Sequence, residues 1–372
     1  MQLEHSLLNN DLLLTQRNYS FLKKILLASL LLLVFFLFFW VNITLILKKQ
    51  QISLSEIITV IFFNRLRKNE NTNGEDELRS VLSVPAVQRA IWICSASAVA
   101  AVAFVICGSA IQSLTQNPLA DATTLGFIDA TIFGIICMKG IFAERIDASY
   151  YQLCYFIFAL LGGLITLTLI SILFKKPQHK NQHLQIIFIG LVMNMMFKTL
   201  SYLIKTSNAN AVNPAFKLAI GGAENIHDLY NNQFGFLQWT AISIFILFLL
   251  TWACSNKFNL FELGEEQAKT FGVNVKLFKY FAYSLALITT TIAVTLVGNI
   301  AFVGLISTHI IRHLFRTRKY QIIVPYASVL AIFLLLTGIL LNAILPFVFS
   351  SIFILCLGGI ILLFLTFNNK EL

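Results

Sequence analysis

Charge is scarce in this sequence of 372 residues, of which 12% are charged and 58% hydrophobic. An ordinary soluble domain carries about 25% charged residues. No Asp, Glu, Lys or Arg occurs between Phe281 and Ile311 or between Tyr320 and Phe367. Together with a mean hydropathy of +0.79, this composition excludes a soluble protein and indicates an integral membrane protein. The apolar runs are continuous and do not alternate with polar residues, so they predict helices and not a barrel.

Catalytic and nucleotide-binding motifs are also missing. The sequence contains no GxxxxGK[ST], no HExxH and no GxSxG, so it has no P-loop and no signature of a metallopeptidase or serine hydrolase. Its six cysteines lie in apolar runs without a CxxC spacing, which predicts neither a metal site nor a disulfide framework. We therefore expect a chain that is not an enzyme and that binds no metal or cofactor itself.

The apolar runs predict an all-α polytopic membrane protein with about ten transmembrane helices within residues 25–367. A span needs about 20 apolar residues, and the run 281–311 would be roughly 47 Å long as one helix. We therefore divide that run at Gly298-Asn299, and we divide 320–367 around 342–346 for the same reason. The other expected spans lie near 25–47, 90–111, 123–138, 150–174, 184–204 and 235–254.

Basic residues indicate the orientation of these spans. With the N-terminus inside, fifteen lysines and arginines fall on inner segments and four on the short outer loops. Seven more fall on the outer segment 48–89, which weakens the contrast, but a long loop constrains orientation less under the positive-inside rule. Cytoplasmic tails are then expected at 1–24 and 368–372, and a cytoplasmic loop at 255–278. The segment 48–89 becomes extracellular, with a polar insert at 66–80 that we expect to be flexible. The net charge of +10 is spread over loops and indicates no nucleic-acid partner.

The stretch 108–127, GSAIQSLTQNPLADATTLGF, interrupts the apolar sequence without a single lysine or arginine. Pro118 cannot donate in a helix interior and restricts the residue before it, so the chain must leave the helix near Asn117. An ordinary turn between helices is one interpretation. The predicted cytoplasmic position without basic residues favours another, a loop buried within the protein or lining its aqueous path.

A second motif, LFELGEEQAKTFGVN at 260–274, predicts a helix of roughly eight residues, far too short to span a membrane. Glu265 and Glu266 suit its N-terminus, Lys269 suits its C-terminal end, and Gly272 is a typical stop. Ala268 and Phe271 lie three residues apart and are expected on one face. The helix is either an interfacial helix or a docking surface for a cytosolic partner.

A third motif is GNIAFVGLISTHIIRHLF at 298–315. Gly298 and Gly304 would allow close helix packing, and His309 and Arg312, at the predicted inner end, are expected to contribute to that packing. His309 is expected to be a hydrogen-bonded structural residue and not a metal ligand, because no second ligand has both helical spacing and acidic residues beside it.

Asp129 and Lys198 are charges within predicted spans. Such a charge costs at least about 2.5–3.5 kcal/mol at the centre of the bilayer, so each should face the bundle interior. A translocation pathway and a buried pair are both open interpretations, and Lys198 has the further alternative of reaching toward an interface.

These motifs, in this order, resemble the FecCD-type permeases of bacterial ABC importers for iron–siderophores, haem and vitamin B12, including the vitamin B12 importer permease. The resemblance covers roughly residues 50–365. The family's G-x-x-x-Q, NPLA and LG correspond to Gly108 with Gln112, to 117–120 and to Leu125-Gly126. Its LGEEXAXXLGV and GXIXFVGLXXPHXXR segments correspond to 263–273 and 298–312.

The resemblance implies a subunit that transports by alternating access in a bacterial cell membrane, with no nucleic-acid partner. Its partners would be a second copy or a sister permease, two cytosolic ATPases that bind ATP and Mg, and an extracellular or lipid-anchored binding protein. The implied gate and pathway residues are Gln112, Asn117, Pro118 and Leu119, to which Asp129 and Lys198 are added from their charge. The implied ATPase-coupling residues are Leu263, Gly264, Glu265, Glu266, Ala268, Phe271 and Gly272.

The likeness is weaker at the predicted outer surface. The family's RLPR-like segment is replaced by SVPAVQRAIWI, which leaves Arg89 and, further upstream, Arg79 as candidate docking residues for a binding protein. Thr308 replaces the proline before His309. The expected cargo is a ferric siderophore or a related iron chelate. Haem, cobalamin, an ion-coupled secondary transporter and a degenerate partner subunit are the alternatives.

Overall fold

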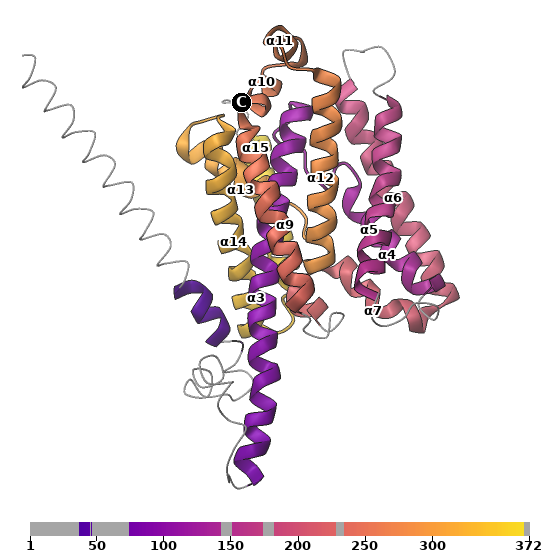
Figure 1. The fold of residues 1–372 in the computed structure, drawn as a ribbon, viewed down its shortest axis with the longest axis vertical. Helices are drawn as coiled ribbons and strands as arrows, with labels where there is room; N and C mark the ends of the chain where they lie inside the picture. Colours follow the sequence, from indigo (N-terminus) through magenta and orange to yellow (C-terminus); the bar gives the residue numbers. More distant parts are fainter. Residues whose placement is uncertain are drawn as a thin grey trace, which may run out of the picture.

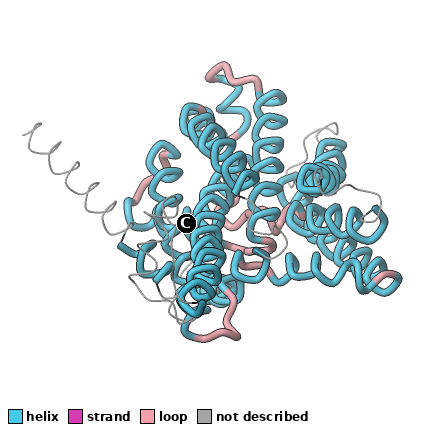
Figure 2. The backbone as a smooth tube through the Cα atoms, turned by 60° about the horizontal axis from the view of Figure 1, so that its bottom comes forward, coloured by secondary structure: helices cyan, strands magenta, loops and turns pink. Residues whose placement is uncertain are grey.

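The computed structural model describes residues 37–44, 46, 74–142, 151–173, 182–227 and 234–367. Within this part of the chain the secondary structure is helical and contains no strand, as Figure 2 shows. The labelled helices are α3 Gly74–Thr115, α4 Phe127–Cys137, η1 Met138–Phe142, α5 Tyr151–Leu173, α6 Gln182–Ser207, α7 Ala209–Ile220, α8 Ala223–Ile226, α9 Phe234–Ala253, α10 Ser255–Glu262, α11 Glu265–Thr270, α12 Val275–Val297, α13 Val303–Phe315, α14 Tyr320–Ile344 and α15 Ser350–Phe367.

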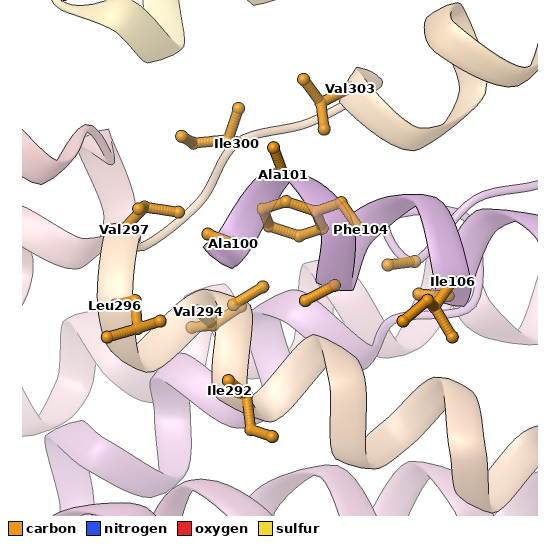
Figure 3. Packing of buried hydrophobic residues seen from close by; sticks show 14 of the residues in the cluster. Ala100, Ala101, Phe104, Ile106, Ile292, Val294, Leu296, Val297, Ile300 and Val303 are labelled. Carbon is orange, nitrogen blue, oxygen red and sulfur yellow. The ribbon is translucent and has the colours of Figure 1, made fainter. Parts of the chain in front are cut away.

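Helix α3 forms the axis of the bundle and packs against α9, α12, α13 and α14. Small buried residues such as Ala100 and Ala101 allow the neighbouring backbones to approach, and Phe104 fills the space beside Val297 and Val303 (Figure 3). A second group is formed by α4 with α5 and α6, seen to the right of α12 in Figure 1. The short helix α11 lies at one end of the bundle, which we call the α11 end.

Five of the described helical segments are long and apolar enough to cross a membrane. They are Ala86–Thr115, Tyr151–Ile172, Phe234–Ala253, Val275–Val297 and Tyr320–Ile344. Large apolar side chains are exposed on several helices, for example Trp239 of α9 at 73%, which suits a hydrocarbon environment. Ten crossings and cytoplasmic termini stay predictions, because 1–36, most of 48–89 and 368–372 lie outside the described residues.

Two predicted boundaries are close to those of the structure and one is wrong. Helix α12 ends at Val297 before Gly298, and α14 ends at Ile344 before α15, near the predicted breaks. The flexible insert expected at 66–80 is contradicted at 74–80, where α3 has already begun. The acidic sequence Gly-Glu-Asp-Glu suits the positive end of a helix dipole. With 42 residues α3 is about 63 Å long, and its first turns extend past the other helices opposite the α11 end (Figure 1).

Candidate gate and coupling site

The NPLA sequence forms a tight turn just after α3. Asn117 Oδ1 accepts a hydrogen bond from the Leu119 N–H (2.9 Å), and the Ala120 N–H donates to the Asn117 carbonyl (3.1 Å). Asparagine before proline favours such a turn, because its side chain replaces a backbone acceptor and the proline ring fixes φ. Gln116, with a φ of +48°, takes the chain out of the helix. Asn117, Pro118 and Leu119 are each partly exposed at the α11 end.

Beyond the turn, residues 120–126 pass back into the bundle. The Asp121 side chain is 1% exposed, and its Oδ2 accepts a hydrogen bond from the Phe302 N–H at 3.1 Å. Helix α6 touches the same loop, since a Cβ added to Gly190 would lie 2.0 Å from the Thr124 carbonyl oxygen. The segment is enclosed by protein, which explains why it carries no lysine or arginine.

Helices α3 and α13 cross with their backbones in contact. A Cβ added to Gly304 would lie 2.3 Å from the Phe104 carbonyl oxygen, and one added to Gly108 would lie 3.3 Å from the Gly304 carbonyl carbon. One turn further along each helix, the Gln112 amide donates to Thr308 Oγ1 (2.9 Å), and the Thr308 hydroxyl is within 3.1 Å of Gln112 Oε1. Gln112 is 2% exposed, so in this conformation it joins α13 to α3 and does not face a passage.

The α11 helix is held to α12 by an ion pair. Lys279 Nζ lies 2.5 Å from Glu265 Oε1, and the two side chains are 12% and 8% exposed. Gly272 has a φ of +80° and follows the end of the helix, as predicted. The shared face expected for Ala268 and Phe271 is wrong: Ala268 is fully buried, whereas Phe271 is 68% exposed. Helix α11 ends at Thr270, so Phe271 has already left the helical register.

Three apolar side chains near α11 remain uncovered. Leu263, Phe271 and Leu277 are 61%, 68% and 70% exposed. Glu266 and Lys269 on the same segment are also exposed. Apolar side chains exposed among charged ones are typical of a protein–protein contact surface.

Arg312 connects α13 to α10 and to α14. Its Nη1 atom lies 2.5 Å from Glu262 Oε1, and its Nη2 donates to the Tyr320 hydroxyl at 2.7 Å. The guanidinium carbon also lies 5.2 Å from the centroid of the Tyr320 ring. The Arg312 and Glu262 side chains are 12% and 17% exposed. Arg312 was expected to contribute to helix packing, and here it does so through charge.

Asp129 and Lys198 form an ion pair between α4 and α6. Lys198 Nζ lies 3.5 Å from Asp129 Oδ2, and the two side chains are 58% and 9% exposed. The pairing was one of the expected arrangements. The expectation that both residues face the interior is wrong for Lys198, whose side chain stays largely exposed beside Met195, itself 73% exposed.

The remaining candidate residues have other surroundings than expected. Gly298 has a φ of +69°, and a Cβ there would lie 2.6 Å from the Leu218 carbonyl oxygen of α7, so it serves a turn as well as close packing. The Nδ1 atom of His309 is buried without a hydrogen-bond partner among the described residues, and the expected structural bond stays a prediction. Arg89 is partly exposed on α3. Arg79 lies in α3, but its side chain is outside the described residues. Docking by these arginines stays a prediction.

Sequence reasoning missed three residues of this site. Asp121 could have been found, because it is a formal charge within a segment that is otherwise neutral. Thr308 and Glu262 gave no such signal. Each acquires its role from a partner that lies 196 or 50 residues away in the sequence. Among the residues that the structure describes, no group of three or more His, Cys, Asp or Glu could hold a metal ion.

A buried carboxylate also lies at the opposite end of the bundle, in the short helix α8. Glu224 Oε1 accepts a hydrogen bond from the Ser350 N–H (2.6 Å), and its Oε2 accepts one from the Ser350 hydroxyl (3.0 Å). The carboxylate thereby caps the first turn of α15. Burial raises the pKa of Glu224, and the two hydrogen bonds from Ser350 oppose that shift.

Comparison with known proteins places the chain among membrane transport proteins. The model of the FecCD transport family matches residues 25–368. Proteins named "Probable heme-iron transport system permease protein IsdF" from Staphylococcus aureus strains RF122 and Newman are 25% identical over 315 residues, covering 83% of this chain and 88% of each relative. A solved structure described as an inward-facing conformation of a metal-chelate type ABC transporter matches with a TM-score of 0.61 at 17% identity. That match covers 89% of this chain and 98% of the other.

Proposed function

The chain belongs to the FecCD transport family, and from this premise we propose that it is the membrane-spanning permease subunit of an ATP-driven importer of iron chelates. It would work in a bacterial cell membrane by alternating access. A second copy or a sister permease would complete the passage, and an extracellular or lipid-anchored binding protein would deliver the cargo.

The observation that carries the proposal is the direct contact between the NPLA turn and the segment that ends in α11. Gln116, the residue before the turn, donates to the Phe261 carbonyl of α10 at 3.4 Å, and α11 follows α10 after two residues. Leu263, Phe271 and Leu277 are exposed at the same end. We assign this apolar surface to a cytosolic ATPase, because the chain has no P-loop and the energy of ATP must come from another subunit.

An iron chelate is proposed as cargo on two grounds. The Staphylococcus aureus relatives bear the name of heme-iron permeases, and Lys198 presents an exposed ammonium group on the apolar α6 surface. The carboxylates of haem, like those of many ferric siderophores, could bind this ammonium. Haem and a ferric siderophore are therefore the two cargoes to compare, with cobalamin as a third.

An ion-coupled secondary transporter is the alternative of a different class. It requires titratable groups that open to the passage during the cycle. Asp129 is the obvious acidic candidate, yet it is paired with Lys198. That mechanism predicts uptake driven by an ion gradient in the absence of an ATPase.

The test is gentle purification of the intact complex, followed by reconstitution into liposomes with labelled haem, ferric siderophore or cobalamin. We expect an ATPase subunit to co-purify. We also expect uptake to require ATP on the side of the membrane where the ATPase subunits lie. A complex with an ATPase that cannot hydrolyse ATP is the matched control. Uptake that persists without the ATPase and collapses with the ion gradient would instead support the secondary transporter.

A further inference from the structure

We propose that the Arg312–Glu262 ion pair is the joint that makes α10, α13 and the NPLA turn move as one body when α11 is displaced. This inference rests on the proposed function and assigns Arg312 and Glu262 as positioning residues for gating. Neither would contact the cargo or the nucleotide.

The first part of the evidence is the attachment of α10 to α3. The Ser113 hydroxyl donates to the Phe258 carbonyl at 2.8 Å, and Gln116 donates to the Phe261 carbonyl at 3.4 Å. Both acceptors are backbone atoms of α10, while both donors lie in the last turn of α3 or directly after it. The bond from Gln116 is long. Asn259 of α10 also accepts a hydrogen bond from the Tyr320 N–H of α14 at 2.8 Å, so the ion pair adds the attachment to α13 that these contacts lack.

The second part is the attachment of α10 to α13. Glu262, the last residue of α10, receives the Arg312 guanidinium at 2.5 Å, in a site where both side chains are less than one-fifth exposed. Arg312 is in turn fixed by the Tyr320 hydroxyl at 2.7 Å. A planar guanidinium held at two points fixes direction as well as distance.

The third part is that these contacts close a ring. Thr308 lies one helical turn before Arg312 on α13 and exchanges hydrogen bonds with Gln112 of α3. Gln112 in turn lies one helical turn before Gln116, the residue that contacts α10. The ring therefore links α10 to both helices that hold the turn, and the ion pair is the contact that closes it on the α13 side.

Only a short link separates this ring from α11. Leu263 and Gly264 follow Glu262, and Gly264 has a φ of +125°, a conformation that L-residues rarely adopt. Because Ala268 is buried and Glu265 is paired with Lys279, α11 is packed against the rest of the bundle and is not held by this link alone. A force on its exposed residues would reach Glu262 within three residues of chain.

The experiment uses the full chain in its complex with the ATPase and needs no knowledge of the cargo. Leu119→Cys is introduced together with Cys137→Ser, Cys154→Ser, Cys254→Ser and Cys356→Ser, since these four cysteines are not fully buried. The rate of maleimide labelling at position 119 is then measured without nucleotide and after trapping with ATP and vanadate. ATP hydrolysis and co-purification of the ATPase are measured on the same preparations.

With Arg312→Met we expect ATP hydrolysis and co-purification to persist while the nucleotide-dependent change in labelling falls at least three-fold. Arg312→Lys should show the same loss in part, because it keeps the charge without the planar contact. The double variant Glu262→Leu/Arg312→Met leaves no unpaired buried charge. It is therefore measured in place of Arg312→Met if that variant does not assemble with the ATPase. Arg318→Met is the matched control, since Arg318 is exposed at the same end.

The inference is overturned if the double variant or Arg312→Met retains the labelling change of the Arg318→Met control. It is also overturned if labelling and ATP hydrolysis fall in the same proportion, since that result indicates a merely structural role. A complex that contains no ATPase even with the unaltered chain would overturn the proposed function instead.

Discussion

Replacing Gly304 with alanine tests the backbone contact between α3 and α13 that lies beside the proposed gate. The new Cβ would lie 2.3 Å from the Phe104 carbonyl oxygen, whereas an ordinary carbon–oxygen contact is about 3.3–3.6 Å. Because the obstacle is backbone and not a flexible side chain, α13 must move away from α3 by about 1 Å. That movement stretches the bonds of Gln112 to Thr308 and of Phe302 to Asp121, now 2.9 and 3.1 Å, to about 4 Å and breaks them.

The magnitude follows from the two effects together. Overpacking a close contact costs about 1–3 kcal/mol, and each lost hydrogen bond costs about 1 kcal/mol. A total of about 3–5 kcal/mol lowers the melting temperature by about 6–10 °C, if each kcal/mol corresponds to about 2 °C in a protein of this size. We expect uptake to fall with it, because the loop that follows the NPLA turn is anchored through Asp121.

The assay is the melting temperature of the purified complex in detergent, followed by uptake in liposomes. Gly108→Ala is the matched control on the facing helix. Its Cβ would lie 3.3 Å from the Gly304 carbonyl carbon, so a shift of a few tenths of an ångström suffices. If the Gly304→Ala complex has the same melting temperature as the Gly108→Ala complex and transports normally, the proposed rigidity of this crossing is refuted.

Three further predictions concern other parts of the chain. Leu119→Trp should reduce uptake at least ten-fold while the ATPase still co-purifies, because the side chain lies in the turn and not on the ATPase-facing surface; loss of assembly alone would indicate a structural turn. Phe271→Glu should do the reverse and weaken co-purification at least ten-fold, whereas Gln267→Glu, a neighbouring exposed change, should not. Burial raises the pKa of Glu224, so the folded protein binds a proton more readily than the unfolded chain and gains stability as the pH falls through the raised pKa toward the ordinary one. The melting temperature of the unaltered chain should therefore rise over this range relative to Glu224→Gln, and parallel curves would show that Glu224 does not titrate there.

The main helix boundaries could be predicted because they depend on local chemistry. The break at Gly298 follows from two adjacent residues that interrupt an apolar run too long for one span, and the exit at Asn117 follows from Pro118. Helix α7 was not predicted, because at 12 residues it is too short to span a membrane and Pro214 lies inside it. The early start of α3 was missed for a related reason: a polar composition was interpreted as a flexible loop, although acidic residues favour a helix N-terminus.

Among the contacts of the candidate site, only one could be predicted, because both of its partners are charged residues within apolar segments. Asp129 and Lys198 are ionisable groups in apolar surroundings, so a pair between them was an open expectation. The ring through Gln112, Thr308 and Glu262 depends on how three helices cross, and no local pattern encodes that arrangement. Thr308 occupies the position where the related motif has proline, and the sequence alone indicated no role for this difference. The structure gives its hydroxyl a partner in Gln112.

The distribution of buried ion pairs supports a transmitting role for the α11 end. Replacing a buried ion pair by apolar side chains of similar volume is often neutral or stabilising, so such pairs are poor devices for stability alone. Yet Glu262 with Arg312 and Glu265 with Lys279 bracket the two residues that join α10 to α11. Each pair fixes this segment to a different long helix, α13 or α12, at a place where apolar packing would permit sliding. Directional contacts on both sides of the link would convert a displacement of α11 into a displacement of the helices that hold the NPLA turn, as the proposed ATP-driven gate requires.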